Sequence, residues 1–129
     1  MFLADLPYYS KVKSQFLGDV IVTHTGIDCG NYVYDDSGMI DVAASIDKAV
    51  ACNRYNYMIG LDIHQVPISD RRLFDSYMIV GHLPTYRLNE DMSNRFYRTE
   101  QYMDIDAGSG HFGGTLGCYC VDTDMEYYV

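Results

Sequence analysis

Short apolar runs separated by polar turns recur along this 129-residue chain, and two of them end alike. Residues 20–22 are apolar, Thr23 and His24 follow them, and a glycine comes two positions after His24. Tyr77–Val80 is apolar throughout and is followed by a glycine and His82. Such runs predict strands, and the second is typical of a strand buried on both faces. Because ligands of open α/β sheets bind at the carboxyl ends of strands, we expect both imidazoles at one edge of one sheet. Two such rings could bind one divalent metal ion.

One amphipathic helix is predicted between these two strands. Its apolar residues recur at helical spacing, namely Met39, Val42, Ala43, Ile46, Ala49 and Val50. We expect Asp36 or Ser37 to cap its start and Asn53 to end it. This narrow stripe of small residues favours packing against a sheet over any cofactor site.

The remaining pattern is rich in strands, particularly toward the C-terminus. We predict strands over 8–13, 94–98 (at a sheet edge), 102–106, 115–121 and 125–129, and the last turns of a helix over 2–6. Residues 54–72 give no clear pattern. With no internal repeat and no linker, residues 1–129 form a single unit of the α/β class, or α+β locally.

Charge and apolar content limit the classes of partner. The formal charge of −9, with no basic stripe, argues against nucleic acid as a partner. No apolar stretch approaches the roughly 20 residues of a membrane span, and the start lacks the basic flank and apolar core of a signal peptide. We therefore expect a cytoplasmic protein with no membrane contact.

The four cysteines fit the same compartment. Cys29, Cys52, Cys118 and Cys120 form no Cys-x-x-Cys pair. In a cytosolic protein such residues behave as small buried hydrophobes, and we expect no disulfide framework.

Three segments, in order, resemble motifs of the calcineurin-like metallophosphoesterases, of the bacterial serine/threonine-phosphatase and diadenosine-tetraphosphatase type. Residues 22–27 read VTHTGI and resemble the family's "Val-His-Ala-Gly" motif, and residues 80–85 read VGHLPT and resemble "Gly-His-Thr-Pro". Residues 104–108 and 112–116 resemble its closing "Ile-Asp-x-Gly" and "Gly-Gly-x-Leu" segments. Three motifs in order are fairly specific. The resemblance implies the C-terminal half of a four-layer αββα sandwich.

The resemblance also implies a chemistry. In that family the histidines matching His24 and His82 bind one ion of a dinuclear centre of the manganese, iron or zinc type. The metal ions bind the phosphate of a phosphorylated substrate and supply the hydroxide that attacks phosphorus. We therefore expect a phosphatase activity for the complete protein.

The departures from the family bear on the isolated chain. The upstream motifs "Asp-x-His-Gly", "Gly-Asp-x-x-Asp-Arg-Gly" and "Gly-Asn-His-Glu" are absent, so no catalytic residue is assigned here. We expect an inactive chain that binds metal weakly or not at all, since tight sites need at least three protein ligands. The chain would then be a fragment, a truncated gene or part of a split protein. It should self-associate or pair with a missing N-terminal half. The alternative is a non-catalytic scaffold or interaction domain derived from that fold.

Three further residues are candidates for lesser roles. Asp106 is expected to hold its loop or a neighbouring histidine, and His111, in a glycine-rich turn, is a candidate for the rim of the site. The order Asp62-Ile63-His64 is that of the family's first metal motif, but the flanking glycines are missing and the segment lies between the other motifs. We expect no metal there.

Overall fold

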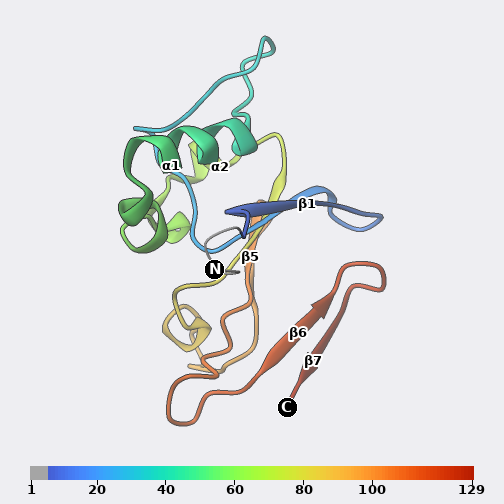
Figure 1. Ribbon diagram of the computed structural model, residues 1–129. Helices are drawn as coiled ribbons and strands as arrows, with labels where there is room; N and C mark the ends of the chain where they lie inside the picture. The colour runs from blue at the N-terminus through green and yellow to red at the C-terminus, as the bar shows by residue number, and fades with distance from the viewer. Residues whose placement is uncertain (1–5) are drawn as a thin grey trace.

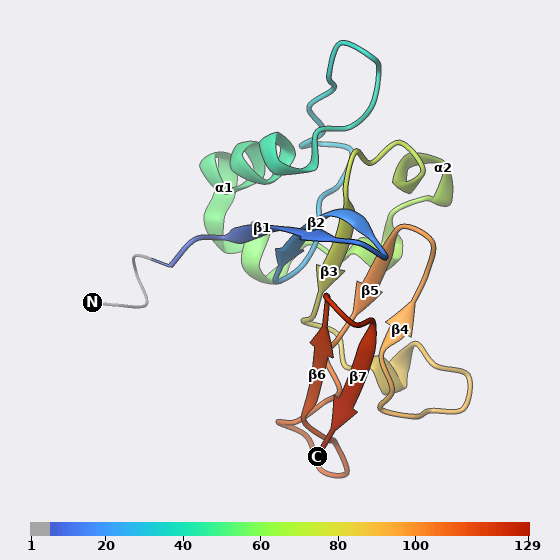
Figure 2. The ribbon, with the colours of Figure 1, turned by 90° about the vertical axis from the view of Figure 1, so that its right-hand side faces the viewer.

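The computed structural model of the protein describes residues 6–129. Its main sheet has five strands in the order β1-β2-β3-β5-β4 (Figures 1 and 2). The strands are β1 (Tyr9–Ser14), β2 (Gly18–Thr23), β3 (Tyr77–Val80), β4 (Tyr97–Arg98) and β5 (Tyr102–Asp104). β2, β3 and β5 are parallel neighbours, whereas the edge strands β1 and β4 are antiparallel to theirs. Three carboxyl ends therefore lie side by side at one edge of the sheet.

One face of the sheet is covered by α1 (Val42–Ile59), which is the predicted helix (Figures 1 and 2). Ile46 is fully buried in the core that this helix forms with Ile21 of β2 and Met78 of β3. The chain leaves helical geometry at Asn53, where a helical end was expected, and a second helical segment runs on to Ile59. The Asn53 side chain accepts a hydrogen bond from the amide of Asn56, so it caps that second segment.

The predicted capping residues of α1 were wrong. Asp41 is the N-cap, and its Oδ1 accepts a 2.8 Å hydrogen bond from the amide of Ala44. Ser37 is instead held in a local turn, because its amide and its hydroxyl both donate to Oδ1 of Asp35. Ile40, inside the predicted helix start, is fully buried in bridge pairs with Tyr34 and Phe74. Tertiary pairing therefore delays the helix by about one turn.

The segment after α1, which the sequence left unassigned, forms short helical turns. These are η2 (Ile63–Gln65) and α2 (Ile68–Arg71), and η3 (Thr85–Arg87) follows β3. The carboxylate of Asp62 caps η2 by accepting the amide of His64. No helix within residues 6–129 has the length and apolar character that a membrane crossing requires.

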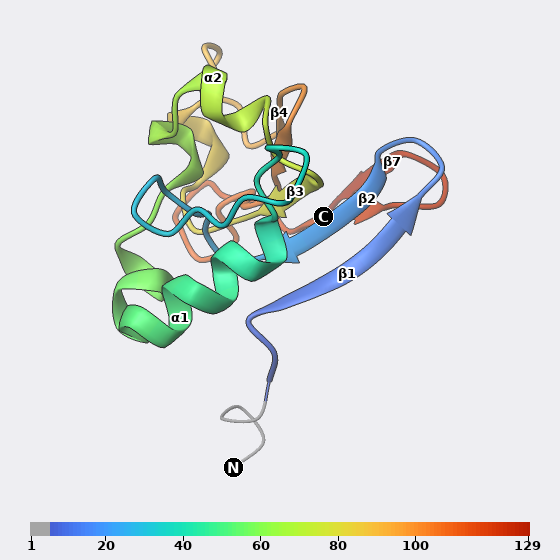
Figure 3. The same cartoon turned by 90° about the horizontal axis from the view of Figure 1, so that it is seen from above.

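The other face of the sheet is covered by the hairpin of β6 (Gly117–Cys120) and β7 (Met125–Tyr128) (Figure 2). Tyr119 and Tyr128 pack against a cluster around Phe96 and Met103. At the far end, the β1–β2 turn meets the β6–β7 turn, where the Ser14 hydroxyl donates to the carbonyl of Val121 (Figure 3). The fold therefore has three layers, which are the helix α1, the five-stranded sheet and the two-stranded hairpin.

This arrangement confirms the mixed α and β class expected from the sequence, with every predicted strand present and most of them shorter at their ends. β3 has the predicted bounds and β4 lies at the predicted edge. β5 stops at Asp104 rather than at residue 106, because the Asp104 side chain accepts the amide of Asp106 and turns the chain. The predicted helix over 2–6 lies outside the described residues, apart from Leu6.

The expectation of buried cysteines was wrong. Cys29, Cys52 and Cys118 are exposed, Cys120 is partly exposed, and all four are free thiols. Cys118 and Cys120 lie on β6 on the opposite side from Tyr119, whose ring fills the space against the sheet.

Candidate functional site

His24 and His82 meet at the carboxyl edge of the sheet, although 58 positions separate them in the chain. His24 directly follows β2, and His82 follows β3 after one glycine. Nδ1 of His82 lies 3.2 Å from Nε2 of His24, and the ring centroids are 4.9 Å apart at 74°. The two loops are joined by a 3.0 Å hydrogen bond from the amide of Gly81 to the carbonyl of His24. The rings therefore meet as expected, while their metal role stays a prediction.

The spacing of the two ring nitrogens fits a shared metal ion. Two imidazole nitrogens that bind one tetrahedral zinc ion at roughly 2.0–2.1 Å stand about 3.3 Å apart. The observed 3.2 Å also suits a hydrogen bond between two neutral rings, one donating and the other accepting. Both side chains are exposed, so a ligand has access from solvent.

The backbone of His82 adopts an unusual conformation. Its φ of 77° lies in the left-handed region, which residues with a Cβ enter at a cost. Residues held in this region cluster at functional sites, where the surrounding structure enforces them. Here the conformation turns the chain sharply between β3 and η3.

The surroundings of His24 lower its pKa, which favours the neutral form that a metal requires. Loss of hydration around its ring lowers the pKa of His24, and repulsion from His82 adds to this effect. The carboxylate of Asp106 acts in the opposite direction. Since only a neutral imidazole can donate its lone pair to a metal, the net shift favours binding at neutral pH.

Asp106 holds the loop after β5, which is one of the two roles expected for it. Its Oδ1 accepts the amide of Gly108 at 2.9 Å, and its carbonyl accepts the amide of Thr85 at 2.8 Å. Within residues 6–129, no cluster of three or more His, Cys, Asp or Glu side chains is close enough to hold a metal ion. The residues present therefore fit two ligands of a metal site and not a complete one.

Among the described residues, His111 makes no recorded contact with His24 or His82. It is exposed in the turn after Gly108, and its ring faces Tyr86 with the centroids 6.4 Å apart. No hydrogen bond among the described residues joins its ring to His24 or His82. The role of His111 at the rim of the site therefore stays a prediction.

His64 has a role at this end of the molecule that sequence reasoning missed. Its Nε2 lies 2.8 Å from Oδ2 of Asp104, and its Nδ1 lies 2.7 Å from the hydroxyl of Tyr102. Asp104 is completely buried, and burial raises the pKa of its carboxyl against the opposing effect of the His64 hydrogen bond. The signal in the sequence was the polar Asp104 inside an apolar strand, which requires a buried partner.

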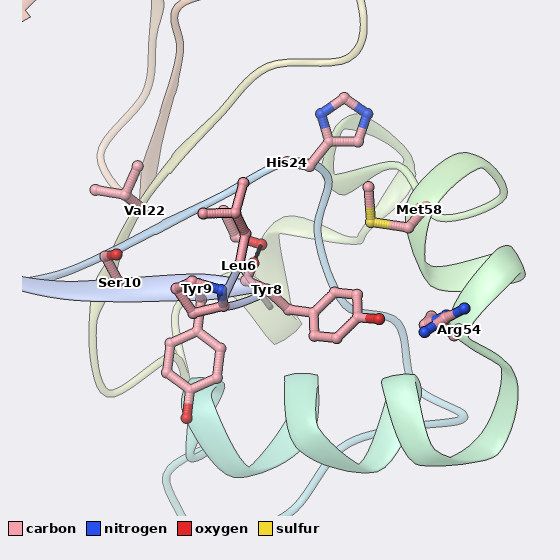
Figure 4. Close-up of a pocket in the computed structure, with 10 residues that line it drawn as sticks. Leu6, Tyr8, Tyr9, Ser10, Val22, His24, Arg54 and Met58 are labelled. Atoms are coloured by element: carbon pink, nitrogen blue, oxygen red, sulfur yellow. Dashed lines mark hydrogen bonds between the residues drawn. The ribbon is translucent and has the colours of Figure 1, made fainter. Parts of the chain in front are cut away.

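A cavity of about 520 Å³ opens beside His24, between β1 and the end of α1 (Figure 4). It is lined by Leu6, Pro7, Tyr8, Tyr9, Ser10, Val22, Thr23, His24, Arg54 and Met58. The imidazole of His24 points away from the side chains of Tyr8 and Tyr9, which line the same cavity (Figure 4). Of the histidine pair, His24 lines this cavity and His82 is not among its lining residues.

No protein-family model, no curated protein and no solved structure matches this chain.

Proposed function

We propose that this chain is the C-terminal half of a cytoplasmic, metal-dependent phosphoesterase and supplies two histidine ligands to its metal centre. One observation carries the proposal: His24 and His82 place two ring nitrogens 3.2 Å apart at the carboxyl edge of a parallel sheet. The order of the resembling motifs along the chain supports it independently.

His24 and His82 would hold one ion of the manganese, iron or zinc type through Nε2 and Nδ1 respectively. Such an ion, when bound, neutralises charge on a phosphate and lowers the pKa of a bound water. The chain's own contribution is geometric, since the hydrogen bond between Gly81 and His24 fixes one loop against the other. The depressed pKa of His24 keeps that ring available as a ligand.

Two histidines are too few for a tight site, so the remaining ligands would come from a segment or partner that carries the upstream motifs. That partner is the N-terminal half of the αββα sandwich, and the substrate is a phosphorylated molecule. In the alternative, the chain keeps this scaffold as a non-catalytic interaction domain.

The decisive experiment compares two polypeptides in p-nitrophenyl phosphate hydrolysis with added Mn²⁺. The 129-residue chain should show no turnover. A polypeptide that also contains an in-frame upstream "Asp-x-His-Gly" segment should be active. Its His82→Ala variant should lose more than about 100-fold, because even outer-shell partners of a metal contribute about 10–100-fold.

Tyr55→Ala is the control, since Tyr55 is 74% exposed on α1 and should leave the activity unchanged. Full activity of His82→Ala would contradict the proposal. Turnover by the 129-residue chain alone would show that it needs no further ligands. A true start and stop around this chain would favour the non-catalytic alternative.

A further inference from the structure

We infer that His64 is a positioning residue, which holds the two loops that carry His24 and His82 in their ligand geometry. This inference rests on the proposed function, because it assigns a purpose to contacts behind the same pair of histidines. His64 lies on η2, between the loop that follows β2 and the end of β5.

Both ring nitrogens of His64 are engaged, and the partners fix its tautomer. In the neutral ring, Nε2–H donates to the carboxylate of Asp104, and Nδ1 accepts the hydroxyl hydrogen of Tyr102. The His64 side chain is 10% exposed and that of Asp104 is fully buried. Removing the ring would leave a buried carboxylate oxygen without this donor, so the loop around Asp104 would have to rearrange.

A chain of hydrogen bonds runs from this pair to the loop of His82. Oδ1 of Asp104 accepts the amide of Asp106 at 2.8 Å. The carbonyl of Asp106 in turn accepts the amide of Thr85, three residues after His82, also at 2.8 Å. Thr85 is completely buried, so the loop that bears His82 is anchored at this point.

A direct packing contact runs from η2 to the loop of His24. A Cβ added at Gly26 would lie 2.8 Å from Cβ of Ile63 and 3.0 Å from its backbone nitrogen. Only glycine allows η2 to approach the chain this closely. Thr25, between His24 and Gly26 in the chain, is buried, and its hydroxyl donates to the carbonyl of Tyr57 on α1 at 2.7 Å. The turn that carries His64 therefore contacts the loop of His24 directly, through Ile63 and Gly26, and reaches the loop of His82 through Asp104 and Asp106.

The test uses Ni²⁺–nitrilotriacetate, a probe that supplies its own ligands and leaves two adjacent positions for imidazoles. Its affinity for the untagged chain is measured by calorimetry, and folding of each variant is checked by thermal unfolding. The His82→Ala variant sets the affinity expected from one histidine. Tyr55→Ala, at a residue that is 74% exposed on α1, is the matched control and should bind as tightly as the natural chain.

We expect His64→Leu to weaken probe binding by about tenfold, toward the one-histidine value, as is typical when an outer-shell partner is lost. His64→Gln, which keeps a donor for Asp104, should restore most of that affinity. A purely structural role would lower thermal stability in both variants without this difference in probe affinity. If His64→Leu does not fold, folded Asp104→Asn takes its place, with an expected loss of about tenfold.

Natural affinity in a folded His64→Leu or Asp104→Asn variant overturns the inference and leaves the proposed function intact. A natural chain that binds the probe no better than His82→Ala overturns the proposed histidine pair and this inference with it. The two failures are therefore distinguishable.

Discussion

Nδ1 of His82 lies 3.2 Å from Nε2 of His24, and this contact depends on the registry of two parallel strands. Val22 of β2 pairs with Ile79 of β3, so both strands reach the edge of the sheet together. Each histidine follows its strand within two residues. A change in registry of one position would turn the side chains to opposite faces and separate the rings. The geometry of the pair is therefore a property of the sheet.

Because the backbone of His82 lies in the left-handed region, we expect two variants that lack its ring to differ in their free energy of unfolding. His82→Gly should be more stable than His82→Ala by about 1 kcal/mol, because glycine adopts a φ near 77° without a Cβ clash. Urea unfolding of both variants measures the difference. Equal stability, or a more stable alanine variant, would show that the backbone at this position is not held in the left-handed region.

The contact between Gly26 and Ile63 predicts that a single methyl group at Gly26 is costly. Gly26→Ala places a Cβ 2.8 Å from Cβ of Ile63 and should destabilise the fold by about 1–3 kcal/mol. Gly110→Ala is the matched control, since nothing lies within 4 Å of a Cβ there. Thermal unfolding of the two variants should separate them clearly. A neutral Gly26→Ala would mean that η2 does not rest on the His24 loop.

Tyr77 predicts a loss of stability at alkaline pH. Burial raises its pKa from 10.0 to about 12, and its hydroxyl donates to the carbonyl of Thr99. Because the folded state holds this proton more tightly, the stabilisation is complete below pH 10 and is lost as the pH rises toward 12. Unfolding free energies between pH 9 and pH 12, for the natural chain and for Tyr77→Phe, measure the contribution. The phenylalanine variant should show a shallower decline, and an identical decline would refute the assignment.

The outer face of the β6–β7 hairpin predicts self-association. Three cross-strand pairs share this face, namely Leu116 with Val129, Cys118 with Tyr127 and Cys120 with Met125. None is charged, and Leu116 and Val129 are 61% and 93% exposed. Apolar surface of this kind is rarely left uncovered.

Sedimentation velocity over a range of concentrations should show reversible association of the isolated chain. Introducing lysine at Tyr127 and Val129 together should weaken it by about tenfold, since two buried charges would then lie in the contact. Tyr55→Lys, on exposed α1 surface, is the control and should associate as the natural chain does. A natural chain that stays monomeric would refute this prediction.

The sequence predicted the parts of the fold that follow from local pattern. The apolar run of β3 and the glycine after it gave the strand its observed bounds, and the helical stripe located α1. The helix start could not be predicted, because Ile40 is held by Phe74, which is far away in the chain. Cys118 and Cys120 were misplaced for a similar reason, because Tyr119 on the other face of β6 is the residue that packs against the sheet.

The site was predicted in part as well. Strand ends are visible in a sequence, so His24 and His82 could be assigned to one edge of the sheet. The partner of His64 was not visible, because Asp104 is 40 positions away and the two meet only after β5 joins the sheet. Contacts of this kind are set by topology and not by any local motif.

The most direct test of the account is a double-mutant cycle on Ni²⁺–nitrilotriacetate binding, with His24→Ala, His82→Ala and the double variant. If the two rings share one metal ion, each single substitution should lower the affinity to the same one-histidine value, and the double substitution should lower it further. Single substitutions that leave the affinity unchanged would contradict the account, since they would describe two separate histidines that each bind the probe alone.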